Sequence, residues 1–197
     1  MLTFLRPSLV LMLLFTALLG LVYPLAITGI AQTVSPFTAN GSVMIKEGGP
    51  IGSDLIGQQF ASEIYFHSRP SATSATDPND ATQTIDAPYN AMGSSGSNLG
   101  PLSQKLVDRV KADIAALGVA SVPADSVTTS ASGLDPDISP VNAMLQIERV
   151  AKARSVDAAK IAELVRTHID SPVFGIFGEA RVNVLRLNLA LDSLSRS

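Results

Sequence analysis

The chain has no cysteine, no tryptophan and only two histidines among its 197 residues. The absence of cysteine excludes disulfides, thiolate nucleophiles, zinc–thiolate centres and iron–sulfur clusters. Two histidines leave little material for a histidine-built metal centre. Any chemistry of this chain therefore has to use hydroxyls, carboxylates, amides or cations.

Positive charge is also scarce. The sequence carries 14 Lys and Arg against 17 Asp and Glu, a formal net charge of −3, and its pI is near 5.3. A nucleic-acid binder needs a concentrated basic face to neutralise phosphates, so we expect no nucleic-acid partner. With 46% hydrophobic and 16% charged residues the chain is apolar for a soluble protein. Its length suits one ordinary domain plus an appendage.

The apolar excess lies near the N-terminus, where residues 9–31 are 23 consecutive positions without a charge. A helix of that length is roughly 34 Å long, which is enough to cross a hydrocarbon core of about 30 Å. We therefore predict a transmembrane helix over residues 9–31. A cleaved signal peptide is the alternative, because Arg6 precedes the run and residues 29–31 form a small-x-small sequence. The run is longer than the ~7–15 apolar residues of a typical signal peptide.

Charge placement predicts the orientation of this helix and small residues predict its packing face. Arg6 precedes the span and Lys46 is the first charge after it. The positive-inside rule then places residues 1–8 in the cytoplasm and residues 32–197 outside it. A stripe of small or helix-kinking residues recurs every four positions and would let a partner helix approach closely: Thr16, Gly20, Pro24 and Thr28. The alternative is a lone anchor without a packing face.

The remaining residues predict one α/β or α+β domain, since short strand patterns alternate with helical ones. Ser139 is placed as an N-cap before Pro140, and Gly118 is placed to end a helix. The expected strands or extended stretches are residues 43–46, 51–60, 127–130 and 181–187. The expected helices are residues 102–117, residues 140–154, a helix from about Asp157, and a short terminal helix capped by Asn188 and ending near residue 194.

Residues 71–101 differ in composition and are rich in Ser, Gly, Asn and Pro. So long a stretch without helix or strand periodicity is either disordered or functional. Its glycine–serine part can form an anion-binding nest, or it can fold on its own amides as a surface loop. It is not a P-loop, because the sequence has no Gly-Lys pair. The candidate nucleotide contacts are Ser95, Gly96 and Asn98 in this loop and Gln146 on the helix predicted over residues 140–154.

Acidic and histidine residues elsewhere give no clear catalytic set. Asp135 and Asp137 precede a predicted helix start, where negative charge serves turns and the helix dipole, so we do not expect a catalytic pair. His67 lacks an orienting acid in the sequence, although a membrane-anchored extracytoplasmic hydrolase that uses His67 stays an alternative. We expect His168 to be a partly buried, hydrogen-bonded histidine. The basic end of the helix over residues 140–154 complements the helix dipole through Arg149, Lys152 and Arg154.

A set of short stretches, in order, covers nearly the whole chain: residues 5–7, 22–25, 28–32, 39–42, 52–53, 55–58, 65–72, 89–101, 131–136, 138–140, 149–154, 181–184 and 187–192. In this combination they resemble one family, the C subunit of the bacterial high-affinity potassium-transporting (Kdp) P-type ATPase. Asp137 stands where that family frequently has His.

The resemblance implies an accessory, non-catalytic subunit of the bacterial inner membrane, with one membrane helix and an extracytoplasmic domain. Its implied partners are a channel-like potassium-binding subunit, a P-type ATP-hydrolysing subunit and a small single-helix subunit. The implied role is assembly or stability, together with a catalytic-chaperone effect that raises the apparent ATP affinity of the pump subunit.

ATP and potassium then belong to the complex, and we expect no cofactor or metal on this chain. The sequence has no Asp-Lys pair for the phosphorylated loop of P-type pumps and no Thr-Val-Gly-Tyr-Gly filter. On the predicted topology ATP lies across the membrane from residues 32–197. An effect on ATP would therefore be allosteric coupling through membrane helices. A subunit that contacts ATP directly, together with the pump subunit, is the alternative.

Overall fold

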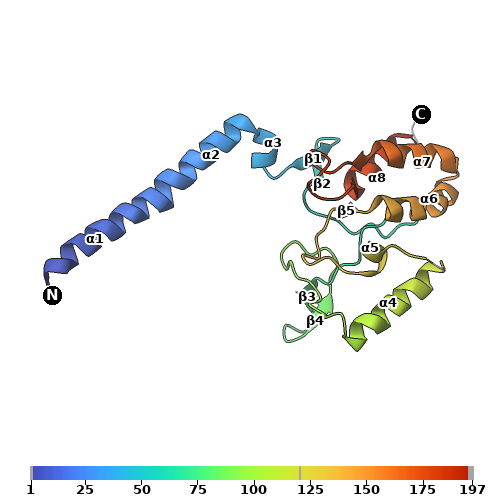
Figure 1. Cartoon of the computed structure of the whole chain (residues 1–197), viewed down its shortest axis with the longest axis horizontal. Helices are drawn as coiled ribbons and strands as arrows, with labels where there is room; N and C mark the ends of the chain where they lie inside the picture. Colours follow the sequence, from blue (N-terminus) through green and yellow to red (C-terminus); the bar gives the residue numbers. More distant parts are fainter. Residues whose placement is uncertain (1, 120, 195–197) are drawn as a thin grey trace. The chain divides into compact units, whose positions relative to one another are not determined.

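The computed structural model describes residues 2–119 and 121–194 (Figure 1). The chain divides into two compact units, Met1–Ser53 and Asp54–Ser197. Unit 1 holds the long apolar helix and a hairpin, whereas unit 2 holds a mixed helix and strand domain.

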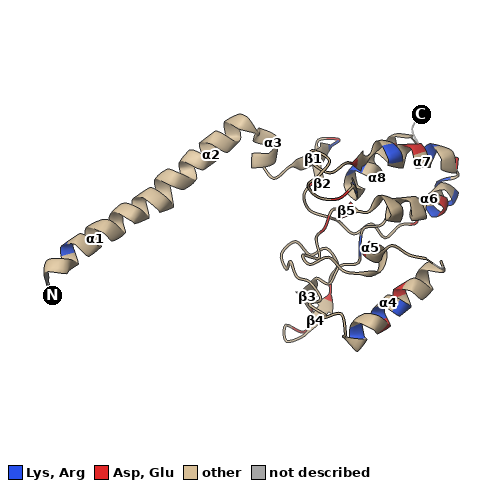
Figure 2. Cartoon of the chain, in the orientation of Figure 1, with Lys and Arg blue, Asp and Glu red and all other residues tan. Residues whose placement is uncertain are grey.

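The apolar helix of unit 1 is continuous through three consecutive elements: α1 (Leu2–Ala17), the π-helical turn η1 (Leu18–Val22) and α2 (Tyr23–Val34). Its candidate membrane span, Thr3–Val34, has 32 residues and a mean hydropathy of 2.4. A helix of that length measures about 48 Å, so both ends can extend beyond a hydrocarbon core of about 30 Å. Arg6 is its one charged residue (Figure 2). The structure thus has one helix long and apolar enough to cross a membrane among its described residues.

A short helix and a hairpin complete unit 1: α3 (Pro36–Ala39), β1 (Val43–Lys46) and β2 (Gly49–Ser53). The strands pair antiparallel through a two-residue turn in which Glu47 and Gly48 both have positive φ. That backbone is the type I′ turn that suits hairpin twist. The strand predicted at residues 43–46 is confirmed, whereas the second strand begins earlier and ends earlier than the stretch predicted over residues 51–60.

Unit 2 is built around a three-stranded antiparallel sheet in the order β5-β7-β6: Asp137–Ile138, Arg181–Asn183 and Ile169–Asp170. Every strand pairing in the described residues is antiparallel, so the domain is α+β rather than parallel α/β. Three helices pack around this sheet (Figure 1): α6 (Pro140–Arg154), α7 (Ala158–Thr167) and α8 (Val184–Leu194). The buried core includes Phe66, Ile138, Val150, Ile161, Val165, Val182, Leu187 and Leu191.

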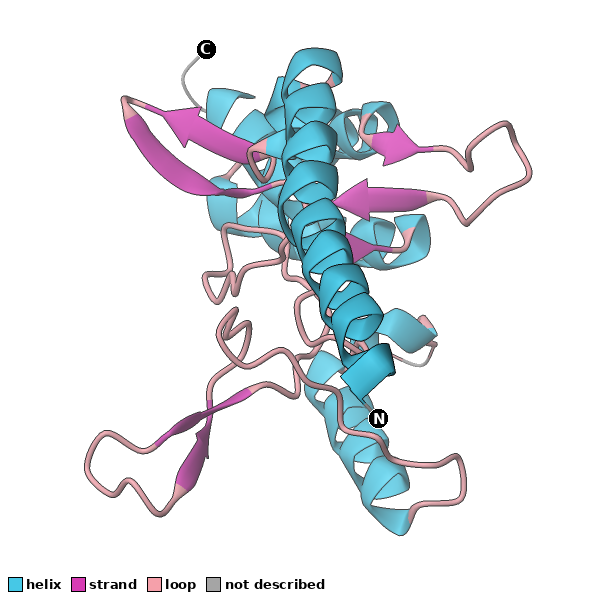
Figure 3. Cartoon of the chain, turned by 90° about the vertical axis from the view of Figure 1, so that its left-hand side faces the viewer, coloured by secondary structure: helices cyan, strands magenta, loops and turns pink. Residues whose placement is uncertain are grey.

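The rest of unit 2 consists mostly of loops (Figure 3) with one longer helix, α4 (Gln104–Leu117), and three short elements: β3 (Ser74–Thr76), β4 (Thr84–Asp86) and α5 (Ala124–Val127). The segment 71–101 is therefore not all loop, because β3 and β4 form a hairpin within it. Gly118 ends α4 in the left-handed conformation, as predicted. The strand predicted over residues 127–130 is wrong, since Val127 ends one helical turn that starts after Pro123.

The helices of the core confirm one local prediction and overturn two others. The Ser139 side chain accepts a hydrogen bond from the Asn142 N–H, which confirms the N-cap of α6. The strand predicted over residues 181–187 ends at Asn183, and Asn188 lies buried inside α8 instead of capping it. The apolar residues of this stretch also satisfy helical spacing. The helix α8 that they form packs against α7, and its buried apolar residues include Val184, Leu187 and Leu191.

Candidate functional site

The predicted helix-packing stripe is open in the described part of the chain. Its four residues are exposed, and a Cβ built on Gly20 meets no described atom within 4 Å. Pro24 lacks the N–H that would reach Gly20, and the π turn η1 precedes it, with the Tyr23 N–H bonded to the Leu18 carbonyl. Thr28 donates from its hydroxyl to the Pro24 carbonyl at 2.8 Å.

The π turn also affects how Thr16, Gly20, Pro24 and Thr28 line up. Four residues exceed the ~3.6 residues of an α-helical turn, so a four-residue repeat drifts around a regular helix. A π turn bonds residue i to i+5 and therefore rotates less per residue, which offsets part of that drift. The stripe as a contact with a partner helix stays a prediction.

In unit 2, a segment without secondary structure is held by side chains rather than by neighbouring strands. We call this segment, Glu63–His67, the clamped segment. Gln146 of α6 accepts from the His67 N–H (2.7 Å) and donates to the His67 carbonyl (3.1 Å). Asn188 of α8 accepts from the Phe66 N–H (2.8 Å) and donates to the Phe66 carbonyl (3.0 Å). Each amide side chain thus replaces the two hydrogen bonds that a neighbouring strand would make.

Two arginines of α6 complete the hold on the clamped segment. Arg149 donates to the carbonyls of Glu63 and Tyr65 at 2.8 and 3.0 Å. Arg154 donates to the Ile64 carbonyl at 2.6 Å and pairs with Asp192 at 2.8 Å. The predicted role of these arginines as partners of the helix dipole is therefore incomplete, since their guanidinium groups bind a neighbouring backbone. Burial lowers the pKa of Arg149.

The two histidines both have structural contacts. His67 Nε2 lies 3.1 Å from the Ser62 carbonyl, and burial, then the Arg149 charge, lower its pKa. His168 ends α7 half-buried, with Nδ1 2.8 Å from the Leu164 carbonyl, which confirms the expected hydrogen-bonded histidine. Among the described residues, no contact of His67 brings it to a carboxylate that could orient it as a catalytic base.

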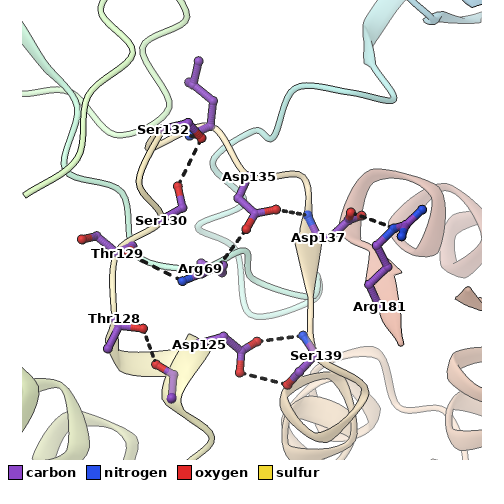
Figure 4. A network of polar contacts seen from close by, with 12 residues as sticks. Arg69, Asp125, Thr128, Thr129, Ser130, Ser132, Asp135, Asp137, Ser139 and Arg181 are labelled. Atoms are coloured by element: carbon purple, nitrogen blue, oxygen red, sulfur yellow. Dashed lines mark hydrogen bonds and ion pairs between the residues drawn. The ribbon is translucent and has the colours of Figure 1, made fainter. Parts of the chain in front are cut away.

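A polar network surrounds the Asp135–Ser139 segment (Figure 4). Arg69 pairs with Asp135 at 2.9 Å, and the other Asp135 oxygen accepts from the Asp137 N–H at 3.0 Å. Asp137 pairs with Arg181 at 3.2 Å, although burial raises the pKa of Asp137. The predicted turn role of Asp135 is confirmed. Because each carboxylate has an arginine partner, Asp135 and Asp137 fit a structural role better than an acid–base catalytic role.

The carboxylate that supports the start of α6 comes from a different element. Asp125 of α5 accepts from the Ser139 N–H at 2.8 Å and from the Ser139 hydroxyl at 2.9 Å. It also accepts from the Asn142 side-chain amide at 3.0 Å. The dipole partner predicted at Asp135 and Asp137 is therefore wrong in position, because Asp125 fills that place.

The same region requires a glycine. A Cβ on Gly57 would lie 2.4 Å from the Asp135 carbonyl oxygen and 2.5 Å from the Tyr89 ring. The Gly57 N–H donates to the Leu134 carbonyl at 2.8 Å. Tyr89 donates to the Arg69 carbonyl at 2.7 Å, and burial raises the pKa of Tyr89 to about 12. These contacts join residues 57, 69, 89 and 135 into one packed unit.

The structure does not bring the predicted nucleotide contacts together. Gln146 lines a cavity of about 310 Å³ together with His67, Asn142 and Arg149, and the other three candidates are absent from its described lining. Both polar atoms of the Gln146 amide are already bonded within the protein. The glycine–serine loop packs on residues 131–132 instead, with the backbone of Ser95 bonded to Ser132 and Gly96 close to Ala131. Asn98 has a left-handed backbone.

Sequence reasoning missed the residues that act across long sequence distances. Only the fold brings Asn188 and Asp125 next to their partners. No local sequence pattern indicates that an amide side chain bonds both the N–H and the carbonyl of a distant residue. The sequence shows that Arg69 and Asp135 carry opposite charges. Because they lie 66 residues apart, no local pattern predicts that they pair.

These features define the class of protein: one helix able to cross a membrane precedes one small antiparallel α+β domain. The sequence matches the KdpC family, K+-transporting ATPase, c chain, over residues 5–193. It is 56% identical over 196 residues to the potassium-transporting ATPase KdpC subunit of Bradyrhizobium diazoefficiens, covering 98% of both chains. It is 54% identical over 200 residues to the Methylorubrum populi KdpC subunit, covering 100% of both. A Rhodopseudomonas palustris KdpC subunit is 53% identical over 192 residues, 95% of this chain and 96% of that one.

The chain therefore belongs to the KdpC family of potassium-transporting ATPase subunits. Potassium transport is the process that this membership assigns to it, and the resemblance stated from the sequence is confirmed.

Proposed function

We propose that this chain is an accessory, non-catalytic subunit that assembles and stabilises a potassium-importing P-type ATPase. Its apolar helix packs against membrane helices of the complex, and unit 2 lies on the extracytoplasmic side against the channel-like subunit. The observation that carries the proposal is the single 32-residue apolar helix joined to a domain of the KdpC family. The partners are the channel-like subunit, the ATP-hydrolysing subunit and the small single-helix subunit.

The orientation follows from the charges that flank the helix. Arg6 is close to its N-terminal end, and no charged residue follows until Lys46. With Arg6 held on the cytoplasmic side by the positive-inside rule, every later residue that could recognise a ligand lies outside the cytoplasm. ATP and unit 2 are then on opposite sides of the bilayer.

An effect on apparent ATP affinity must in that case be allosteric. The chain raises the affinity only if it binds one state of the pump more tightly than another, because equal binding to both states shifts nothing. The apolar helix is the one described element able to transmit that difference across the membrane. The bonded state of the Gln146 amide supports this version over direct nucleotide contact.

The test compares ATP hydrolysis by the assembled complex with and without this chain. We expect a higher ATP concentration for half-maximal rate when the chain is removed, and no crosslink from a photoreactive ATP analogue to the chain in the complete complex. Ser95→Ala probes direct contact at the glycine–serine loop with little disturbance of the fold, because the Ser95 hydroxyl makes a long 3.3 Å bond to the Ala72 carbonyl. A crosslink that unlabelled ATP competes away and that Ser95→Ala weakens would replace the allosteric account with direct nucleotide contact.

A further inference from the structure

The connection between β6 and β7 exposes an unusual cluster of apolar side chains. We call residues 172–177 the apolar loop. Its large side chains are all exposed to solvent: Val173 at 52%, Phe174 at 87%, Ile176 at 77% and Phe177 at 67%. The loop carries no charge, and the nearest charged residues are Asp170 before it and Glu179 after it. Contiguous exposed apolar groups of this kind mark contact with a membrane or with another protein.

Most backbone N–H groups of the apolar loop are bonded within the loop. Val173 and Phe177 exchange both hydrogen bonds, at 2.9 and 3.0 Å. Gly175 donates to the Pro172 carbonyl at 2.9 Å, and Ile176 donates to the Val173 carbonyl at 3.2 Å. Pro172 has no N–H to satisfy. A loop that enters an apolar medium must bond its polar backbone groups internally, and most N–H groups of this loop meet that condition.

The tip of the loop places an aromatic residue in a costly conformation. Phe174 has a φ of 54°, in the left-handed region that bulky residues seldom adopt, and Gly175 beside it has a φ of 73°. A residue that is both strained and exposed contributes little to the stability of the domain. Such an outlier points to a function outside the fold.

Hydrogen bonds connect the base of the loop to the point where unit 2 begins. In the antiparallel register of β6 and β7 the backbone of Asp170 lies opposite that of Arg181, and β7 continues to Asn183. Asn183 donates to the Asp54 carbonyl at 2.9 Å, and Asp54 also pairs with Arg186. Asp54, the first residue of unit 2, is therefore hydrogen-bonded to the last residue of β7.

Within unit 1, hydrogen bonds also connect the end of the hairpin to the apolar helix. Ser53, which precedes Asp54, donates from its hydroxyl to the Gly41 carbonyl at 2.7 Å. The neighbouring Asn40 exchanges two side-chain hydrogen bonds with Gln32 of α2, at 3.0 and 3.1 Å. Within unit 1, the residue that precedes Asp54 is thus linked by hydrogen bonds to the end of the apolar helix.

We propose that the apolar loop inserts its side chains into the interface of the lipid bilayer and so forms a second membrane contact of this chain. Four exposed apolar side chains on an uncharged loop whose N–H groups are mostly bonded internally need no shaped pocket, which favours a deformable lipid surface over a protein partner. The proposal needs the apolar helix to span the membrane, but it does not depend on the pump partners proposed above. The two can therefore fail separately.

The absence of cysteine makes the test direct, because each introduced cysteine is the single labelling site of the full chain. The variants Phe174→Cys and Ile176→Cys carry an environment-sensitive fluorophore, and Met92→Cys, an exposed apolar residue of a different loop at 98% exposure, is the matched control. The labelled chains are reconstituted in vesicles of phosphatidylcholine and phosphatidylglycerol, with or without bromine on the acyl chains.

We expect brominated lipid to cause a loss of emission at positions 174 and 176, and iodide in the water to quench them less than position 92. Equal iodide quenching at all three positions would overturn the proposal. The measurement is then repeated on membranes of cells that also express the other subunits of the ATPase. Shielding of position 174 from both lipid and iodide there would also overturn it, since a protein partner would cover the loop.

Discussion

Replacing Asn188 by alanine removes both side-chain hydrogen bonds that hold the Phe66 backbone in place. Asn188 is 2% exposed and Phe66 is fully buried, so water cannot replace the lost amide without opening the core. Each buried polar group left without a partner costs about 1–3 kcal/mol. One N–H and one carbonyl are lost, so we expect the free energy of unfolding to fall by about 2–6 kcal/mol, a large share of the ~5–15 kcal/mol of a typical domain.

The assay is urea unfolding of the detergent-solubilised chain followed by circular dichroism. Gln146→Ala is the comparison, because Gln146 makes the same pair of bonds to His67 at a half-buried site, in addition to its bonds with Asn142 and Arg149. Water can reach that site, so the loss should be smaller, about 1–2 kcal/mol. Lys160→Ala, on the exposed face of α7, should change little. If Asn188→Ala lowers the free energy of unfolding less than Gln146→Ala does, buried amide side chains are not what holds the clamped segment in place.

Three further changes test other parts of the structure. In the membrane helix, Gly20→Leu should weaken co-purification of the ATPase subunits by roughly tenfold, about 1–2 kcal/mol, because a large side chain blocks close helix approach. Gly29→Leu, which lies off the stripe, should not weaken it. Equal yields for the two variants would count against the stripe. The pKa of His67 is lowered by burial from 6.5, so the unfolded chain takes up that proton first, and the free energy of unfolding should fall as the pH drops through 6.5. His67→Gln should flatten this decline, and an unchanged pH profile would contradict the assignment. Gly57→Ala should lower the free energy of unfolding by about 1–3 kcal/mol, because the added Cβ clashes with the Asp135 carbonyl. Gly100→Ala, where the added Cβ meets no atom within 4 Å, should be nearly neutral. Similar losses for both variants would exclude the clash as the cause.

Local chemistry predicted those elements whose ends are fixed by their own residues. The α6 helix was predicted within a residue because Ser139 caps it and Pro140 can start it. The end of α4 at Gly118 likewise depends on a conformation that glycine adopts easily. In both cases the signal and the structure lie within a few residues of one another.

Elements that depend on distant partners could not be predicted in the same way. The apolar residues around Val184 fit a strand and a helix equally by pattern, and packing against α7 decides for the helix. The buried position of Asn188 comes from Phe66, which lies 122 residues away in the sequence. The exposed apolar loop at residues 172–177 gave no periodic signal, since its exposure is a property of the folded sheet.

The most direct test of the account is the side of the membrane on which unit 2 lies. Leu102→Cys places a thiol at a position that is 98% exposed, and Thr3→Cys places one before Arg6 at the other end of the apolar helix. The account predicts that a membrane-impermeant maleimide labels position 102 in cells whose outer envelope has been opened, and labels position 3 only after the cytoplasmic membrane is broken. Labelling of position 3 but not of position 102 in cells with an intact cytoplasmic membrane would contradict it.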